Sequence, residues 1–278
     1  MNQMAFSATR LALIAQNTLR ESVRQRFFFL LLLATAAGGF AVWSFRDCAF
    51  VAPGTKFLLD GGFGALTFLG AVLAIVTAAQ SFSGEIERRT VLVVLAMPVG
   101  RMEFILGKLA GILALLLVFF AAGTGLLAGI VLWQQAGAGT ASSMMPDNGG
   151  HVSCSAVVAC GLVQWLRSSV LAALTLLVAT YARSSLFAMV SGFAALVICN
   201  LQSLARDASR IAGSGWASGV FGVAGFAFPD FGLYDVADGV AAGGTLSTAY
   251  VVGLALYSTA YVGLFGGLAA FCFHYREL

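Results

Sequence analysis

Long stretches without any charged residue are the feature that most constrains this chain. Residues Phe27 to Phe45 form a run of 19 residues that contains no Asp, Glu, Lys or Arg, and several later runs are as long or longer. A hydrocarbon core of about 30 Å requires about 20 mostly apolar residues per helix. Open sheets cannot span lipid, because their unpaired backbone groups stay unsatisfied there. The sequence therefore predicts an all-α integral membrane protein.

Composition supports this class. Hydrophobic residues make up 60% of the chain and charged residues 10%, whereas a soluble domain carries roughly 25% charged residues. The runs predict six transmembrane helices in one transmembrane domain that covers residues 1–278. The expected spans are 27–45, 61–82, 109–133, 156–181, 186–204 and 250–273.

The segment between the fifth and sixth expected spans, residues 205–249, is predicted to lie on the outer side. Within it, Ile211 to Pro229 is uncharged but contains five glycines. Each glycine disfavours a helix by about 1 kcal/mol relative to alanine. Short re-entrant or interfacial helices are therefore expected before the last span, and a seventh span is the alternative.

The distribution of Lys and Arg predicts the orientation. With six spans, ten of these residues lie on one side and four on the other, while Arg167 falls inside a span. Positive charge is retained on the cytoplasmic side, so both termini are expected in the cytoplasm. The net charge of +3 is then a topology signal, and no nucleic-acid partner is needed to explain it. The ten are Arg10, Arg20, Arg24, Arg26, Arg88, Arg89, Arg101, Lys108, Arg183 and Arg276, and the four are Arg46, Lys56, Arg206 and Arg210.

An amphipathic helix is expected over residues 7–26. At 100° per residue, Leu11, Ala15, Leu19 and Val23 share one face, and Arg10, Arg20 and Arg24 share the opposite face. Basic helices of this type lie in the headgroup region of a membrane. A simple anchor and a part that transmits motion are both compatible with this pattern.

The densest cluster of charge lies in residues 83–108, where seven residues are charged. The cluster is expected to face water as a loop between two spans. Glu85 and Glu87 are predicted to begin a short helix that Pro98 ends, because proline lacks the backbone donor and clashes with the preceding turn. Arg101 and Glu103 are predicted to open a second helix, which continues into the third span.

The motifs of this loop resemble those of a known family. Gly84-Glu85, Arg89-Thr90, Leu95, Pro98, Arg101 and Gly107-Lys108 are similar to the first cytoplasmic loop of type-2 ABC transporter permeases, which reads like S-G-E-x-E-x-G-T, then L-L-x-x-P-x-x-R and G-K. Arg89 stands where that pattern usually has Gly. The segment from Phe228 to Asp235 and the ending Tyr275-Arg276-Glu277-Leu278 resemble the nitrous-oxide-reductase maturation permeases within that family.

This resemblance implies a permease subunit of an ATP-driven exporter in a bacterial-type inner membrane. Two permease copies, identical or related, would pair in the bilayer and work with two copies of a separate ABC ATPase, which would carry the ATP and Mg. The loop would dock on the ATPase, and a solvated loop that only fixes topology is the alternative. The residues expected at this contact are Glu85, Glu87, Arg88, Arg89, Pro98, Arg101 and Lys108.

The chain itself is not expected to be an enzyme or to bind a cofactor. A phosphate-binding loop requires G-x-x-x-x-G-K-S/T, but Gly107-Lys108 has Met102 at the first glycine position and Leu109 at the hydroxyl position. No catalytic group and no metal site is predicted, since the five cysteines show no C-x-x-C spacing. Cys48 and Cys154 are expected on the same outer side, either as free thiols or as a disulfide.

Arg167 is the one charge expected inside a span. An ionisable residue at membrane depth is a candidate functional residue, so Arg167 is a candidate for the translocation pathway. The alternative is that its side chain reaches the outer interface. An ion-coupled secondary transporter is the second function considered, and the placement of all acidic residues outside the expected spans argues against it. Lipid, drug, peptide, ion and sulfur species are all compatible substrates.

Overall fold

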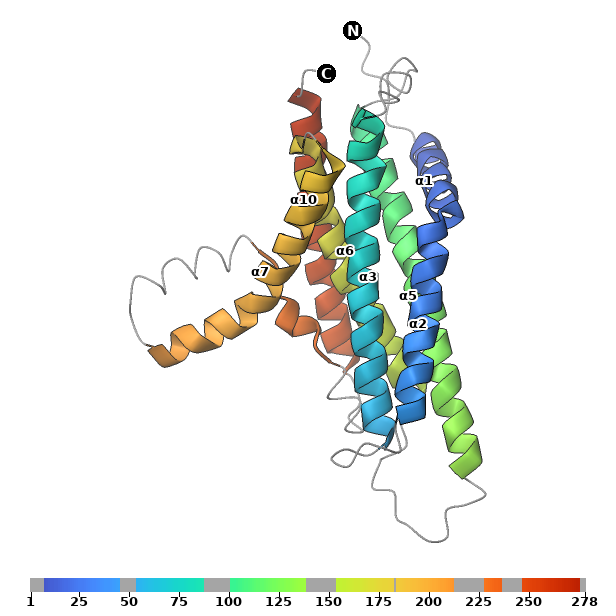
Figure 1. The fold of residues 1–278 in the computed structure, drawn as a ribbon. Coiled ribbons are helices and arrows are strands. Elements are labelled where there is room, and N and C mark those ends of the chain that lie inside the picture. The colour runs from blue at the N-terminus through green and yellow to red at the C-terminus, as the bar shows by residue number, and fades with distance from the viewer. Residues whose placement is uncertain are drawn as a thin grey trace.

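The computed structural model describes residues 8–45, 54–87, 101–138, 154–182, 184–212, 228–236 and 247–275. Every element in these residues is helical (Figure 1). Six of the helices are long and apolar enough to cross a membrane. The prediction of an all-α protein with six spans is therefore confirmed.

The six long helices run alternately up and down the bundle (Figure 1). The end of α3 and the start of α5 lie at the same end of the bundle as α1 and the last turn of α10. We call this the charged end. The long helices are α2 (Arg26–Phe45), α3 (Gly54–Glu87), α5 (Arg101–Ala138), α6 (Cys154–Tyr181), α7 (Ser185–Ala212) and α10 (Thr248–Tyr275).

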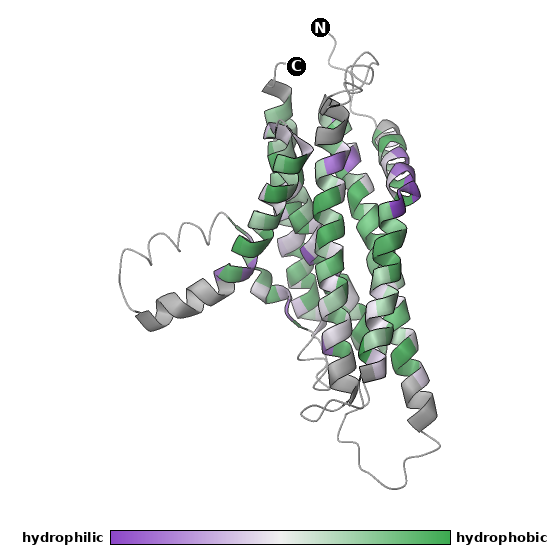
Figure 2. Ribbon diagram, viewed as in Figure 1, coloured by the Kyte–Doolittle hydropathy of each residue, from purple (hydrophilic) through white to green (hydrophobic). Residues whose placement is uncertain are grey.

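The inner helices are α3, α5 and α6, and α6 packs against α3, α5, α7 and α10. In the candidate spans of α3, α5 and α6, 61–67% of residues are buried, compared with 22–28% in α2, α7 and α10. The outer helices are largely hydrophobic (Figure 2). Many of their apolar side chains are exposed, as in lipid-facing helices. Examples are Leu33 and Phe40 on α2, Leu186 and Val190 on α7, and Leu256 on α10.

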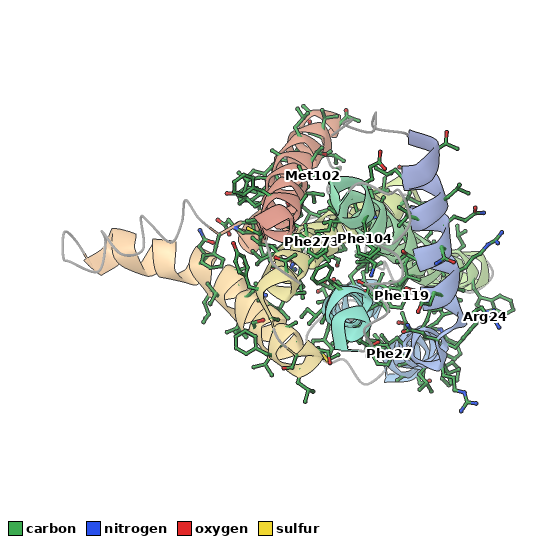
Figure 3. The ribbon with its side chains drawn as sticks, turned by 90° about the horizontal axis from the view of Figure 1, so that it is seen from above. Arg24, Phe27, Met102, Phe104, Phe119 and Phe273 are labelled. Carbon is green, nitrogen blue, oxygen red and sulfur yellow. The ribbon has the colours of Figure 1, made fainter. Side chains whose placement is uncertain are left out.

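The N-terminal helix α1 (Ala8–Arg24) lies across the bundle axis. Figure 3, viewed along that axis, shows α1 at full length, while α3 and α5 appear nearly end-on. The predicted helix is present, and its apolar face rests on α5. Thr18 and Ser22 are buried in this contact, whereas Arg20 and Arg24 are exposed. Its placement at a membrane surface stays a prediction.

Two glycines on α5 allow α1 to approach closely. A Cβ atom on Gly107 would lie 2.9 Å from the side chain of Ile14, and one on Gly111 would lie 2.8 Å from the carbonyl oxygen of Ala15. Small residues four apart let helices approach closely in lipid. Gly125 and Gly129 have the same spacing further along α5, but their Cβ positions have open space around them.

Several helix limits differ from the predicted ones. Helix α3 continues to Glu87, so Glu85 and Glu87 end this helix and do not begin a separate one. No proline interrupts the segment after Phe82, and Ser83 and Gly84 alone do not stop a helix that is already packed. Helix α7 likewise continues to Ala212, beyond the expected limit at residue 204. The predicted re-entrant segment 211–229 lies largely outside the described residues.

Candidate functional site

A cavity of about 440 Å³ lies between α3, α6, α7 and the short 3-10 helix η2 (Phe231–Tyr234). Small-molecule sites typically have volumes of about 300–1,000 Å³. The lining combines buried side chains such as Phe63 and Leu171 with the exposed side chains of Phe68 and Asn200. The cavity is therefore reachable from outside the bundle.

Arg167 on α6 is a central polar group of this cavity. Its guanidinium group donates a hydrogen bond to Oδ1 of Asn200 on α7. The same group lies 5.1 Å from the centre of the Phe231 ring, within the range of a cation–π interaction. These contacts hold Arg167 between three elements. Arg167 lies within the candidate span of α6, as predicted. Its role in a translocation pathway and the reach of its side chain to an interface stay predictions.

The position of the cavity along the bundle follows from helix geometry. Arg167 is 14 residues from Tyr181, where α6 ends at the charged end. Asn200 is 15 residues from Ser185, where α7 begins. At 1.5 Å per residue, both lie about 21–22 Å from the charged end. Both helices have 28 residues, or about 42 Å at the same rise, so Arg167 and Asn200 lie near the middle of α6 and α7.

The segment that contains η2 forms one wall. The Asp230 carboxylate accepts a hydrogen bond from the backbone of Gly232 at 2.9 Å and so caps the short helix. The phenol of Tyr234 is fully buried and lies 2.7 Å from the hydroxyl of Ser258 on α10. Burial raises the pKa of Tyr234 to about 12. These bonds fix Phe231 and Asp235 at the cavity.

Gln164 supplies a buried polar group one helical turn from Arg167. Its side chain is 3% exposed and lines the cavity. Its Nε2 donates to the backbone carbonyl of Tyr234 at 3.4 Å. A carbonyl accepts only from a donor, so this bond fixes the orientation of the amide. The Oε1 atom is buried and has no hydrogen-bond partner within the described part of the chain.

Two carboxylates complete the polar lining, and one of them corrects a sequence prediction. Asp60 on α3 and Asp235 after η2 both line the cavity. Asp60 was expected just outside the second span, but the candidate span begins at Leu59. The expectation that no acidic residue lies within a span is therefore wrong. The error arises because α3 begins at Gly54, ahead of the uncharged run.

Lys108 corrects the prediction that the whole charged segment faces water. It is 3% exposed and lies within α5. Its Nζ donates to the backbone carbonyl of Ser81 on α3 and lies 4.6 Å from the centre of the Phe104 ring. Glu103, in the first turn of α5, is also buried, at 4% exposure. The α5 helix packs at this level between α1, α3 and α10, so its side chains are enclosed.

Aromatic side chains surround Lys108. The rings of Phe82 and Phe273 meet edge to face with their centres 5.4 Å apart, and the rings of Phe104 and Phe273 lie 6.4 Å apart. Figure 3 shows Phe104 and Phe273 next to each other in the view from the charged end. Helices α3, α5 and α10 are thus joined at this end by one lysine and three phenylalanines.

Three of the other predicted ATPase contacts lie at helix ends. Glu85 and Glu87 fall in the last turn of α3, and Arg101 is the first residue of α5. Arg88, Arg89 and Pro98 lie outside the described residues. Helix limits alone therefore place Glu87 and Arg101 at the same end of the bundle (Figure 1). The role of all seven residues stays a prediction.

Several cavity residues were missed from the sequence. Asn200 and Gln164 are uncharged polar residues within apolar runs, and this is a signal that could have been used, because polar groups in lipid need partners. Phe231 has no such signal. Cys154, predicted on the outer side, carries a free thiol in the structure, and Cys48 lies outside the described residues.

The fold and the cavity define a multi-pass helical membrane protein with a polar site between its helices. The profile of the ABC-2 family transporter protein family matches residues 15–204, which is more than half of the chain. The chain therefore belongs to this family and is a permease-type subunit of an ABC transporter. No curated protein matches the sequence.

Proposed function

We propose that this chain is the membrane subunit of an ATP-driven exporter, which works with separate ATPase subunits that carry ATP and Mg. The observation that carries the proposal is the family match over residues 15–204. It covers the predicted coupling segment 83–108 and both helices that flank it. In this arrangement two permease copies, identical or related, pair in a bacterial-type inner membrane, and two ATPase copies dock at the charged end.

Contacts at the charged end support a role in coupling to a motor. Helix α3 ends there and α5 begins there, and Lys108 on α5 donates a hydrogen bond to the carbonyl of Ser81 on α3. Phe273 extends the same contact to α10. A push on the segment between Glu87 and Arg101 would therefore reach three helices at once. Packed interiors shift between discrete arrangements and do not deform continuously, so a small movement here can be passed along whole helices.

The resemblance of residues 228–235 to the nitrous-oxide-reductase maturation permeases supports a narrower proposal. In this chain the segment forms η2 and places Phe231 and Asp235 at the cavity. We assign the chain to that subgroup on this segment and on its C-terminal tetrapeptide. The uneven distribution of Lys and Arg supports the further proposal that both termini lie in the cytoplasm.

An ion-coupled transporter is the second candidate, and one observation favours it. Carriers of that class place acidic groups at membrane depth, and Asp60 lies within a candidate span beside the cavity. The family match and the charged segment favour the ATP-driven exporter. The two readings differ in whether transport needs a nucleotide.

The deciding experiment is co-purification with the candidate ATPase, followed by measurement of ATP turnover. The native chain is compared with a Glu85→Ala/Arg101→Ala variant. Lys56→Ala serves as the control, because Lys56 lies in the first turn of α3 at the opposite end of the bundle. We expect the double variant to lose binding or coupled turnover and the control to keep both. A native chain that purifies without the ATPase, and transports in an ion gradient alone, would overturn the proposal.

A further inference from the structure

We propose that the cavity between α3, α6, α7 and η2 binds a zwitterion. The primary ammonium group of the ligand would lie at Gln164 Oε1, and its anionic group would lie at Arg167. No step of this proposal depends on how transport is driven. It concerns a site within one chain, and its test is a binding test.

The charged lining contains both signs. Asp60 and Asp235 contribute carboxylates and Arg167 contributes a guanidinium group. With all three ionised, the charged lining carries one excess negative charge. Asp235 lies close enough to Arg167 for the two charges to interact, and a ligand that brings groups of both signs fits such a mixed lining better than a simple anion. A metal dication fits poorly, because Arg167 would face it in the same cavity.

The uncharged lining adds an acceptor that requires a donor. Gln164 is 97% buried, lines the cavity and keeps its Oε1 without a partner among the described residues, while its Nε2 is held by the carbonyl of Tyr234. Leaving a buried acceptor unsatisfied costs about 1–3 kcal/mol. An ammonium group offers three donors and no acceptor. It can therefore donate to Oε1 and still has two donors for neighbouring acceptors.

Arg167 is held in a position to meet the anionic part of the ligand. Asn200 and the Phe231 ring fix the guanidinium group, but one hydrogen bond uses only one of its five N–H donors. Guanidinium groups bind phosphate and carboxylate oxygens in a fork geometry. Bulky Phe231 and Phe63 line the same cavity and limit the ligand to a small headgroup.

The edge of the cavity is apolar. Phe68 on α3 is 62% exposed and borders the cavity, and Leu196 on α7 lines it beside the exposed side chain of Val197. An ammonium-bearing zwitterion can reach such a site from two sources. One is an ethanolamine phospholipid, whose acyl chains would lie along this edge, and the other is a small soluble zwitterion.

The test uses the full-length chain in vesicles of equal parts phosphatidylethanolamine and phosphatidylcholine. The protein is extracted and the retained lipids are quantified by mass spectrometry. Phosphatidylcholine has the same phosphate but no N–H donor on its nitrogen, so the ratio of the two lipids reports the ammonium contact. Thermal unfolding with added soluble phosphoethanolamine tests the second source.

The structure offers a matched pair of variants. Gln164→Leu removes the unsatisfied acceptor at the cavity, while Gln202→Leu removes a glutamine on α7 that is also buried and does not line the cavity. Asp235→Asn removes a carboxylate that is exposed at the cavity, and its fold is checked by the unfolding temperature. We expect Gln164→Leu and Asp235→Asn each to reduce the ratio of retained phosphatidylethanolamine to phosphatidylcholine about tenfold. Gln202→Leu should leave this ratio unchanged.

Each outcome decides the proposal. Retention of phosphatidylethanolamine that both cavity variants reduce supports the lipid as the source. A rise in unfolding temperature with phosphoethanolamine that the same variants abolish supports the soluble source. Equal retention of the two lipids together with no response to phosphoethanolamine would overturn the proposal. A preference that the folded cavity variants keep would also overturn it, because the ligand would then bind elsewhere.

Discussion

Arg167 donates a hydrogen bond to the side-chain oxygen of Asn200, 33 residues away, and so joins α6 to α7 near the middle of both helices. Asn200 in turn donates through its amide to the carbonyl of Leu196 at 2.8 Å. The amide is therefore held in the orientation that presents its oxygen to Arg167. This polar link lies beside Phe231, so three elements meet at one guanidinium group.

A double-mutant cycle should measure this link. Lysine at position 167 keeps the charge but lacks the planar fork of arginine, so Arg167→Lys and Asn200→Ala should each lower the unfolding temperature. We expect a coupling energy of about 1–2 kcal/mol between the two sites. Arg20→Lys, at an exposed position of α1, is the control and should leave the temperature unchanged. Strict additivity of the two substitutions would show that the contact contributes nothing.

Alanine substitutions at two glycines of α5 should have opposite effects. At Gly111 a methyl group meets the carbonyl oxygen of Ala15 and the Cβ of Thr18, each at 2.8 Å, so Gly111→Ala should destabilise the contact with α1 by about 1–3 kcal/mol. At Gly129 the methyl group meets nothing, and the higher helix propensity of alanine should stabilise α5 by up to about 1 kcal/mol.

Thermal unfolding and protease cleavage within α1 check this pair. The Gly111→Ala variant should be cleaved faster in α1 than the native chain, and Gly129→Ala should not. Equal cleavage and equal stability of the two variants would contradict the close packing of α1 on α5.

Lys108 should contribute to coupling between the permease and the ATPase through its hydrogen bond to Ser81, and not through its charge alone. Lys108→Met keeps most of the side-chain volume among Phe82, Phe104 and Phe273 but removes the donor to the Ser81 carbonyl. That carbonyl belongs to the last turns of α3. We expect the variant to remain folded and to bind the ATPase, while ATP turnover no longer responds to the permease.

Lys108→Arg is the matched comparison for this prediction. It restores a donor and the positive charge, so partial recovery of coupled turnover is expected. Retention of full coupling in Lys108→Met would remove Lys108 from the coupling path and leave it as a packing residue.

The spans were predictable because lipid imposes a simple rule on sequence. Runs without charge are long, and the helices α2, α6 and α10 fall on them with only small differences at the ends. Helix limits near charged residues were less predictable. The charge of Asp60 led to a predicted start of the second span at Gly61, but the helix starts at Gly54. A carboxylate that faces a polar cavity can lie inside a span.

The contents of the cavity were not predictable from periodicity. Gln164 and Arg167 are one turn apart on α6, and this much follows from sequence. Their partners Tyr234, Asn200 and Phe231 come from segments that only tertiary packing brings together. Lys108 was misplaced for the same reason, since charge predicts exposure unless neighbouring helices enclose the side chain and offer it a carbonyl group.

Tyr234 should titrate at unusually high pH. Its phenol is buried beside Ser258, and burial raises its pKa from 10.0 to about 12. The neutral form is therefore favoured in the folded state. This contribution to stability is fully present below about pH 10, the ordinary pKa of tyrosine, and is lost as the pH rises toward 12.

Tyr234→Phe separates this titration from that of other groups. The variant loses the hydrogen bond to Ser258, worth about 1 kcal/mol at neutral pH. The difference in unfolding free energy between the native chain and the variant should be constant up to about pH 10 and should shrink between pH 10 and 12. In that range the phenol ionises in the unfolded chain but stays neutral in the folded chain, which stabilises the unfolded state. Absorbance of the phenolate, measured as the difference between the two proteins, should appear near pH 12. Its appearance near pH 10 would show that the phenol is open to solvent, and that η2 does not close this wall of the cavity.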